Sequence, residues 1–216
     1  SRKLHHSGKI YALKVLKRFS EILNVSQITN LKIIATAVLR EASDARPFTE
    51  EVEKLFQKKI EILSGDQEAE CAAEGVKIGF ENVDGLVADL GGGSLELAKV
   101  ENNLITNKTS LPLGVLRLIN NPIVKKRNLS KYIKNLFADE KWLSKKKFKN
   151  LYLVGGTWRA LFKLHLFQND HPVHIINQYS SDNERLKKFL DKISSFNKSK
   201  LKTVEYISKS RTQYLP

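Results

Sequence analysis

The chain has 216 residues, of which 41% are hydrophobic, and a formal net charge of +14. That length supports one large domain or two small ones, and the apolar content is enough for a real core, which excludes wholesale disorder. The single cysteine, Cys71, excludes an internal disulfide. Together with the lack of a membrane-length apolar run or a charged-then-apolar leader, it predicts a soluble cytoplasmic protein.

The positive charge is concentrated in the second half of the chain. Residues 1–116 carry 15 Lys and Arg against 16 Asp and Glu, a net charge of −1, whereas residues 117–216 carry 22 against 7, a net charge of +15. Such a field concentrates polyanions, whether nucleic acid, nucleotides or a phosphate polymer. Single lysine runs, at residues 145–147 and 187–188, are also explained by solvation of a helix face.

Hydrophobic spacing predicts alternating helices and strands in the first third of the chain. Apolar residues three and four apart predict a helix over residues 10–23, and an apolar run predicts a strand over residues 31–36. Three further elements are expected before residue 64: a helix at residues 37–42 that carries Arg40, a helix at residues 48–56 and a strand at residues 60–63.

The next helix has a local start signal. Ser64 and Gln67 have the spacing of a capping box, so a helix should begin here and continue to about Val76. Glu68 then lies in its first turn, where a carboxylate is already favourable to the helix dipole. Glu70 competes for any role proposed for Glu68, and Cys71 is expected to pack in the core.

A glycine turn with flanking acids follows. Residues 86–90 predict a buried strand, residues 95–97 alternate as a second strand would, and residues 91–93 are all glycine. Without β-carbons, backbone N–H groups can converge on an anion. Asp89 and Glu96 would then lie where a divalent cation or an attacking water is held. An ordinary hairpin is the alternative interpretation.

The remaining pattern contains a second glycine motif. Residues 104–111 should complete a three-stranded meander, and residues 151–154 predict a strand that leads into Gly155-Gly156-Thr157 and a helix. The free N–H groups of a helix N-terminus can bind phosphate, although a plain tight turn fits equally well. The other expected helices are a short one at Arg117 and longer ones at residues 129–137, 182–195 and 199–210.

Alternating strands and helices predict an α/β fold, and five motifs within them resemble successive signatures of the exopolyphosphatase and guanosine pentaphosphate phosphohydrolase (Ppx/GppA) family. In chain order these motifs occupy residues 35–42, 62–69, 87–96, 110–117 and 155–157. The resemblance covers nearly the whole chain from about Gly8 onward and is far more specific than one glycine turn.

The resemblance implies an actin-like ATPase (ribonuclease H-like) fold of two lobes, with substrate phosphates in the cleft between them. We expect a first lobe at residues 1–74 and a second, strongly basic toward its C-terminus, at residues 75–216. The family's first phosphate loop, Asp-x-Gly-Ser-Asn-Ser, has no counterpart here. We therefore expect the first lobe to be truncated at its N-terminus.

The resemblance also assigns roles residue by residue. It implies that Glu68 positions and activates the attacking water and that Arg40 meets charge on the phosphoryl group. Asp89 and Glu96 are implied to hold Mg²⁺ and water. The implied phosphate-binding residues are Gly91, Gly92, Gly93 and Ser94 in the first motif and Gly155, Gly156 and Thr157 in the second. Leu95 stands where the family generally has threonine.

The implied activity is Mg²⁺-assisted release of terminal orthophosphate from inorganic polyphosphate, or of the 5′ terminal phosphate of guanosine pentaphosphate. Family analogy also suggests a homodimer. Two alternatives stay open: a module that grips polyphosphate or RNA without hydrolysing it, and an actin-like kinase that phosphorylates a small molecule. The missing phosphate loop favours the first, whereas retention of Glu68 and Glu96 favours hydrolysis over it. The motif at residues 64–69 speaks against the second.

Overall fold

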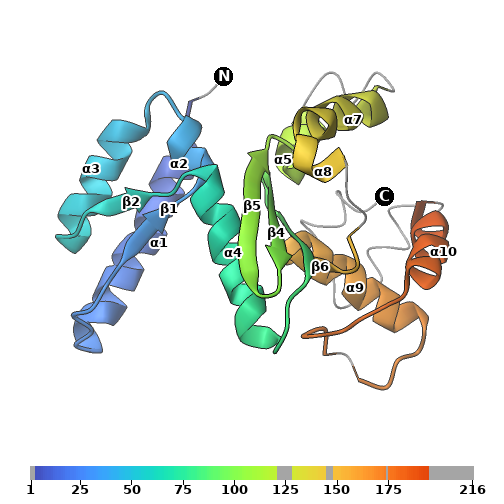
Figure 1. Cartoon of the computed structure of the whole chain (residues 1–216). Helices are drawn as coiled ribbons and strands as arrows, with labels where there is room; N and C mark the ends of the chain where they lie inside the picture. Colours follow the sequence, from blue (N-terminus) through green and yellow to red (C-terminus); the bar gives the residue numbers. More distant parts are fainter. Residues whose placement is uncertain (1–2, 121–127, 145–147, 174, 195–216) are drawn as a thin grey trace. The chain divides into compact units, whose positions relative to one another are not determined.

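A computed structural model describes residues 3–120, 128–144, 148–173 and 175–194, and its chain divides into two compact units, Ser1–Glu68 and Ala69–Pro216. Both units combine helices with strands, so the expected α/β class is observed (Figure 1). The expected lobe boundary after residue 74 stays a prediction. The expected helix at residues 199–210 and the lysine run at residues 145–147 lie outside the described residues.

The first unit joins a small parallel sheet to three helices. β1 (Ile33–Ala35) pairs in parallel with β2 (Ile60–Ile62), and the N–H of Leu63 donates to the Ala35 carbonyl at 2.9 Å, just beyond the register. The helices are α1 (His6–Val25), α2 (Ala37–Glu41) and α3 (Ala45–Phe56). Each element lies where hydrophobic spacing placed it, within four residues at its ends.

The capping box forms at the start of α4 (Gly65–Gly79) as predicted. The Ser64 hydroxyl accepts from the Gln67 N–H at 3.2 Å, and the Gln67 side-chain oxygen accepts from the Ser64 N–H at 2.7 Å. The helix continues three residues beyond the predicted end at Val76. The prediction that Cys71 packs in the core was wrong, because the buried face of α4 is formed by Ala69, Ala73 and Val76, and Cys71 is exposed.

The second unit is built on a four-stranded sheet in the order β5-β4-β3-β6 (Figure 1). The predicted meander is present, since β3 and β4 are antiparallel and so are β4 and β5. β6 joins β3 in parallel. The strands are β3 (Gly85–Leu90), β4 (Leu95–Glu101), β5 (Leu104–Leu111) and β6 (Leu151–Val154).

Helices cover both faces of this sheet. On one face α4 packs through its alanines against Val87, Ala98 and Val100. On the other face Leu97 and Leu111 lie among apolar residues from three helices, α5 (Val115–Asn120), α7 (Leu129–Asp139) and α8 (Lys141–Ser144). Double coverage explains why six consecutive residues of β4 are buried instead of alternating in burial.

Two helices complete the described part of the second unit. α9 (Gly156–Gln168) follows β6, and it packs on α10 (Asn183–Ser194) through Leu161, Leu164, Phe189 and Ile193. Among the residues that the structure describes, no helix is both long and apolar enough to cross a membrane.

Candidate active site

Asp89 and Glu96 form a cross-strand pair in the second unit. They are register partners in β3 and β4, and residues directly opposite each other in a sheet share one face. Ser110 is the next partner across the sheet, on β5, and its hydroxyl donates to Glu96 Oε1 at 2.9 Å. Glu96 is only 4% exposed. The two implied metal ligands are therefore held side by side, and a hydroxyl orients one of them.

The glycine turn between β3 and β4 (residues 91–94) is closed by a hydrogen bond from the Gly91 N–H to the Ser94 carbonyl at 3.0 Å. All three glycine carbonyls accept hydrogen bonds from α5. The donors are the Val115 N–H to Gly91 at 3.1 Å, the N–H groups of Leu116 and Arg117 to Gly92 at 2.9 and 3.2 Å, and Arg117 Nε to Gly93 at 2.7 Å.

This bonding pattern sets the direction of the following N–H groups. In a trans peptide the C=O and the next N–H point in opposite directions, and no described peptide bond is cis. Because the glycine carbonyls point at α5, the N–H groups of Gly92, Gly93 and Ser94 point away from it. Three successive N–H groups on one side of a turn make a concavity suited to an anion.

Gly114 allows α5 to approach the turn. A β-carbon at this residue would lie 2.2 to 2.4 Å from backbone atoms of Gly92, Gly93 and Ser94, closer than real side chains come. The sequence pattern predicted a short helix at Arg117 and no contact for Gly114 or for the Arg117 side chain. The joint signature at residues 110–117 was the signal that could have revealed their contact with the turn.

The second glycine motif lies beside Asp89. β6 pairs with β3 so that Val154 is opposite Asp89, which places Gly155 at the same sheet edge. Gly155 has φ +104°, and a β-carbon there would lie 2.4 Å from Asp89 Oδ1. The structure therefore brings Asp89 together with the start of α9, whose first residues are Gly156 and Thr157. Their phosphate-binding role stays a prediction.

Arg40 and Glu68 lie together in the first unit. Arg40 Nη1 donates to the Leu63 carbonyl at 2.6 Å and also forms an ion pair with the Glu68 carboxylate. Their side chains are 26% and 14% exposed, so both are largely shielded from water. The pair fixes the Glu68 carboxylate at the first turn of α4.

Glu70, the competitor for the role of Glu68, has a different partner. Its carboxylate forms an ion pair with Lys108 on β5, within the second unit. This contact ties α4 to the sheet and gives Glu70 a structural explanation.

The donor set fits magnesium. Mg²⁺ in phosphate-processing sites is commonly held by one or two carboxylates, with substrate oxygens and waters completing an octahedron. Asp89 and Glu96 supply two carboxylates on one sheet face beside both glycine motifs. Within the described ranges no group of three or more His, Cys, Asp or Glu could hold an ion by protein ligands alone.

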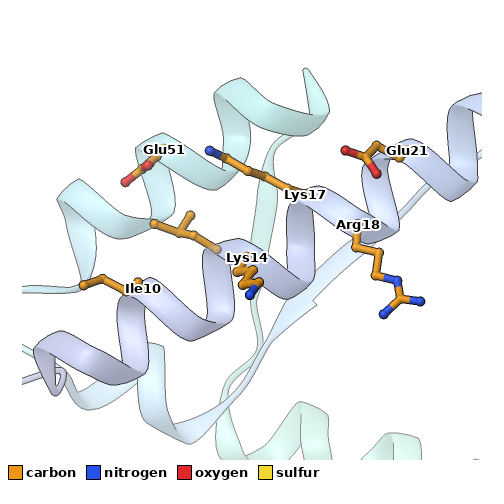
Figure 2. Close-up of a pocket in the computed structure, with 7 residues that line it drawn as sticks. Ile10, Lys14, Lys17, Arg18, Glu21 and Glu51 are labelled. Atoms are coloured by element: carbon orange, nitrogen blue, oxygen red, sulfur yellow. The ribbon is translucent and has the colours of Figure 1, made fainter.

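An open groove in the first unit is a weaker candidate. It lies along α1 next to α3, and its charged residues are Lys14, Lys17, Arg18, Glu21 and Glu51 (Figure 2). Figure 2 shows Lys17 extending toward the α3 side, whereas Arg18 points away from it. Its lining mixes three cations with two acids and includes no glycine turn of the kind found in the second unit.

A model of the Ppx/GppA phosphatase family matches residues 3–216. The chain belongs to that family. Curated Ppx/GppA relatives include a guanosine-5′-triphosphate,3′-diphosphate pyrophosphatase from Aeromonas hydrophila, 36% identical over 107 residues, and one from Aliivibrio fischeri, 32% identical over 112 residues. These matches cover 49% and 51% of this chain and 22% of each relative, so the matched part spans about a fifth of those proteins.

Solved structures share the fold. An exopolyphosphatase from Cytophaga hutchinsonii matches with a TM-score of 0.82 and 20% identity, covering 98% of this chain and 72% of that one. A Ppx/GppA family member from Aquifex aeolicus matches with a TM-score of 0.73 and 20% identity, covering 99% and 72%. The expected α/β fold is confirmed, and these solved Ppx/GppA structures share it.

Proposed function

We propose that the protein is a phosphoanhydride hydrolase that releases terminal orthophosphate from inorganic polyphosphate. The observation that carries the proposal is the pinned glycine turn, which turns three N–H groups to one side next to the paired carboxylates of Asp89 and Glu96. Membership of the Ppx/GppA family and the fold shared with an exopolyphosphatase support it.

In the proposed reaction a water oxygen attacks the terminal phosphorus in line with the bridging oxygen. The new P–O bond forms as the anhydride P–O bond breaks, the shortened chain leaves with the bond electrons, and Glu68 takes the proton of the water. The N–H groups of Gly92, Gly93 and Ser94 hold phosphate oxygens, and Arg40 offsets their charge. Mg²⁺, held by Asp89 and Glu96 when bound, would supply electrostatic stabilisation of the phosphoryl oxygens.

Guanosine pentaphosphate is the second candidate substrate. The curated relatives are named for guanosine-5′-triphosphate,3′-diphosphate, and they exceed 30% identity over their matched residues. The +15 charge of residues 117–216 suits a long anionic chain better than one nucleotide, which is why polyphosphate is preferred.

The test is a direct comparison of orthophosphate release from long-chain polyphosphate and from guanosine pentaphosphate, with Mg²⁺ and with excess chelator. Faster Mg²⁺-dependent release from polyphosphate supports the proposal. Faster release from the nucleotide would identify guanosine pentaphosphate as the substrate instead. Binding of both without release from either would identify the polyanion-binding alternative and end the hydrolase proposal.

The proposal also covers the cellular location and the oligomeric state of the protein. A reducing, cytoplasmic location is supported by the single cysteine, and a homodimer is proposed by analogy with the family alone. Nucleic acid is not proposed as a partner, because the relatives and solved structures are named for guanosine-5′-triphosphate,3′-diphosphate and for polyphosphate.

A further inference from the structure

The Arg117 side chain is bonded to the glycine turn, although the proposed reaction does not use it. Its Nε donates to the Gly93 carbonyl at 2.7 Å, and its own backbone N–H donates to the Gly92 carbonyl at 3.2 Å. One residue of α5 thus holds two consecutive peptide groups of the turn.

The side-chain bond differs from the backbone bonds around it. The donor is a charged guanidinium, and charge-assisted hydrogen bonds are roughly twice as strong as neutral ones. Donation to a carbonyl also polarises the same peptide group, which makes the following N–H a better donor. That following N–H belongs to Ser94, the last of the three N–H groups that point away from α5.

The backbone freedom of Gly93 explains why the bond from Arg117 matters for the orientation of the next peptide group. A peptide group that follows glycine can rotate into orientations closed to other residues, so the direction of the Ser94 N–H is not fixed by local sterics. The carbonyls of Gly91 and Gly92 are held by backbone donors of α5, whereas the Gly93 carbonyl accepts from the Arg117 side chain.

We propose that Arg117 is a positioning residue, which orients and polarises the Gly93–Ser94 peptide so that the Ser94 N–H faces bound phosphate. The inference rests on the proposed function, since it takes the glycine turn as the phosphate site. Arg117 acts through the peptide group. Attachment of α5 to the turn does not depend on it alone, because the Val115 and Leu116 N–H groups and the close approach of Gly114 remain.

The test compares Arg117→Met with the full wild-type chain, using tripolyphosphate and Mg²⁺. The turn holds phosphate in the ground state and the transition state alike, so losing this contact should raise KM about tenfold and leave kcat within about twofold. Free guanidinium ion should partly restore KM in Arg117→Ala. The matched control is Asn120→Ala, which removes a bond from Asn120 Nδ2 to the Leu116 carbonyl at 2.9 Å and loosens α5 without touching Arg117.

A purely structural role gives a different result. If Arg117→Met lowers both kcat and the urea unfolding midpoint while KM stays unchanged, the variant merely reduces the folded fraction and the inference is overturned. An unchanged KM also overturns it.

A readout without substrate separates this inference from the proposed function. If the wild type releases no phosphate, the proposed function fails, and Arg117 is judged on amide resonances of the ligand-free chain. The Gly93 and Ser94 amides should then shift and broaden in Arg117→Met but not in Asn120→Ala. Unaltered resonances would overturn the positioning role.

Discussion

The Arg40–Glu68 pair is the sharpest test at the scale of single residues. Glu68→Gln keeps a side-chain oxygen that accepts from Arg40 but removes the group that takes the proton of the water. We expect turnover to fall between about 10² and 10⁴-fold while substrate binding is preserved. Orthophosphate release and equilibrium binding of tripolyphosphate are the two measurements.

The matched control lies two residues away. Glu70→Gln changes a carboxylate on the same helix that is paired with Lys108, and its turnover should stay within about twofold of wild type. Release by Glu68→Gln comparable to that of Glu70→Gln would remove Glu68 from the mechanism.

Two glycine-to-alanine variants distinguish a glycine that the backbone conformation requires from a glycine that only weakens a helix. Gly155 has φ +104° and no room beside Asp89, so Gly155→Ala should destabilise the protein by roughly 1–3 kcal/mol and weaken phosphate binding. Gly75 lies inside α4, and a β-carbon added there would meet nothing within 4 Å, so Gly75→Ala should stabilise by roughly 0.5–1 kcal/mol. Urea unfolding midpoints measure both, and equal midpoints for the two variants would contradict this account.

At the scale of elements, the α9–α10 pair contains a buried titratable group. His165 is 4% exposed, and its ring lies against the rings of Phe162 and Phe189 with Nδ1 3.0 Å from the Tyr179 hydroxyl. Burial, and secondly the positive charge of Arg185, lower the pKa of His165 from its ordinary value of about 6.5.

This lowered pKa gives a signed prediction for stability. Below about pH 6.5 the unfolded chain takes up a proton at His165 that the folded chain does not. The contribution of neutral His165 to the free energy of unfolding is therefore intact above pH 6.5 and is lost as pH falls toward the folded pKa. Urea midpoints of wild type and His165→Gln between about pH 7.5 and pH 5 check it. The wild type should lose more stability than the variant, and parallel losses would show that His165 is not the group responsible.

Elements with local signals were predictable from the sequence. The capping box at Ser64 needs only residues three apart, and both of its hydrogen bonds are present. The β3–β4–β5 meander follows from turn residues between apolar runs. Cys71 was misplaced because an alanine-rich helix gives little indication of which face is buried.

The site was predictable only in its parts. The sequence pattern places Asp89 and Glu96 on either side of the glycine turn. It does not predict the contact of Gly155 with Asp89, because that contact depends on parallel pairing of two strands far apart in the chain. The bond from Arg117 to Gly93 likewise crosses 24 positions of the chain. Packing between distant segments decides both contacts, and no local pattern encodes it.

At the scale of the whole molecule, the proposed hydrolase and the alternative polyanion-binding module predict different locations for bound phosphate. A hydrolase of the Ppx/GppA type holds it at the glycine motifs, where N–H groups and acids are fixed by the sheet. A polyanion-binding module would hold it on lysine-bearing helices such as α10, which carries Lys187, Lys188 and Lys192.

The most direct measurement is therefore a map of backbone amide shifts as tripolyphosphate and Mg²⁺ are added to the full chain. We expect the largest shifts at Gly92, Gly93 and Ser94, with smaller ones at Gly156 and Thr157. These shifts should be lost in Asp89→Asn when Mg²⁺ is present. Shifts confined to the lysines of α10 and their neighbours, with the glycine turn unmoved, would contradict it.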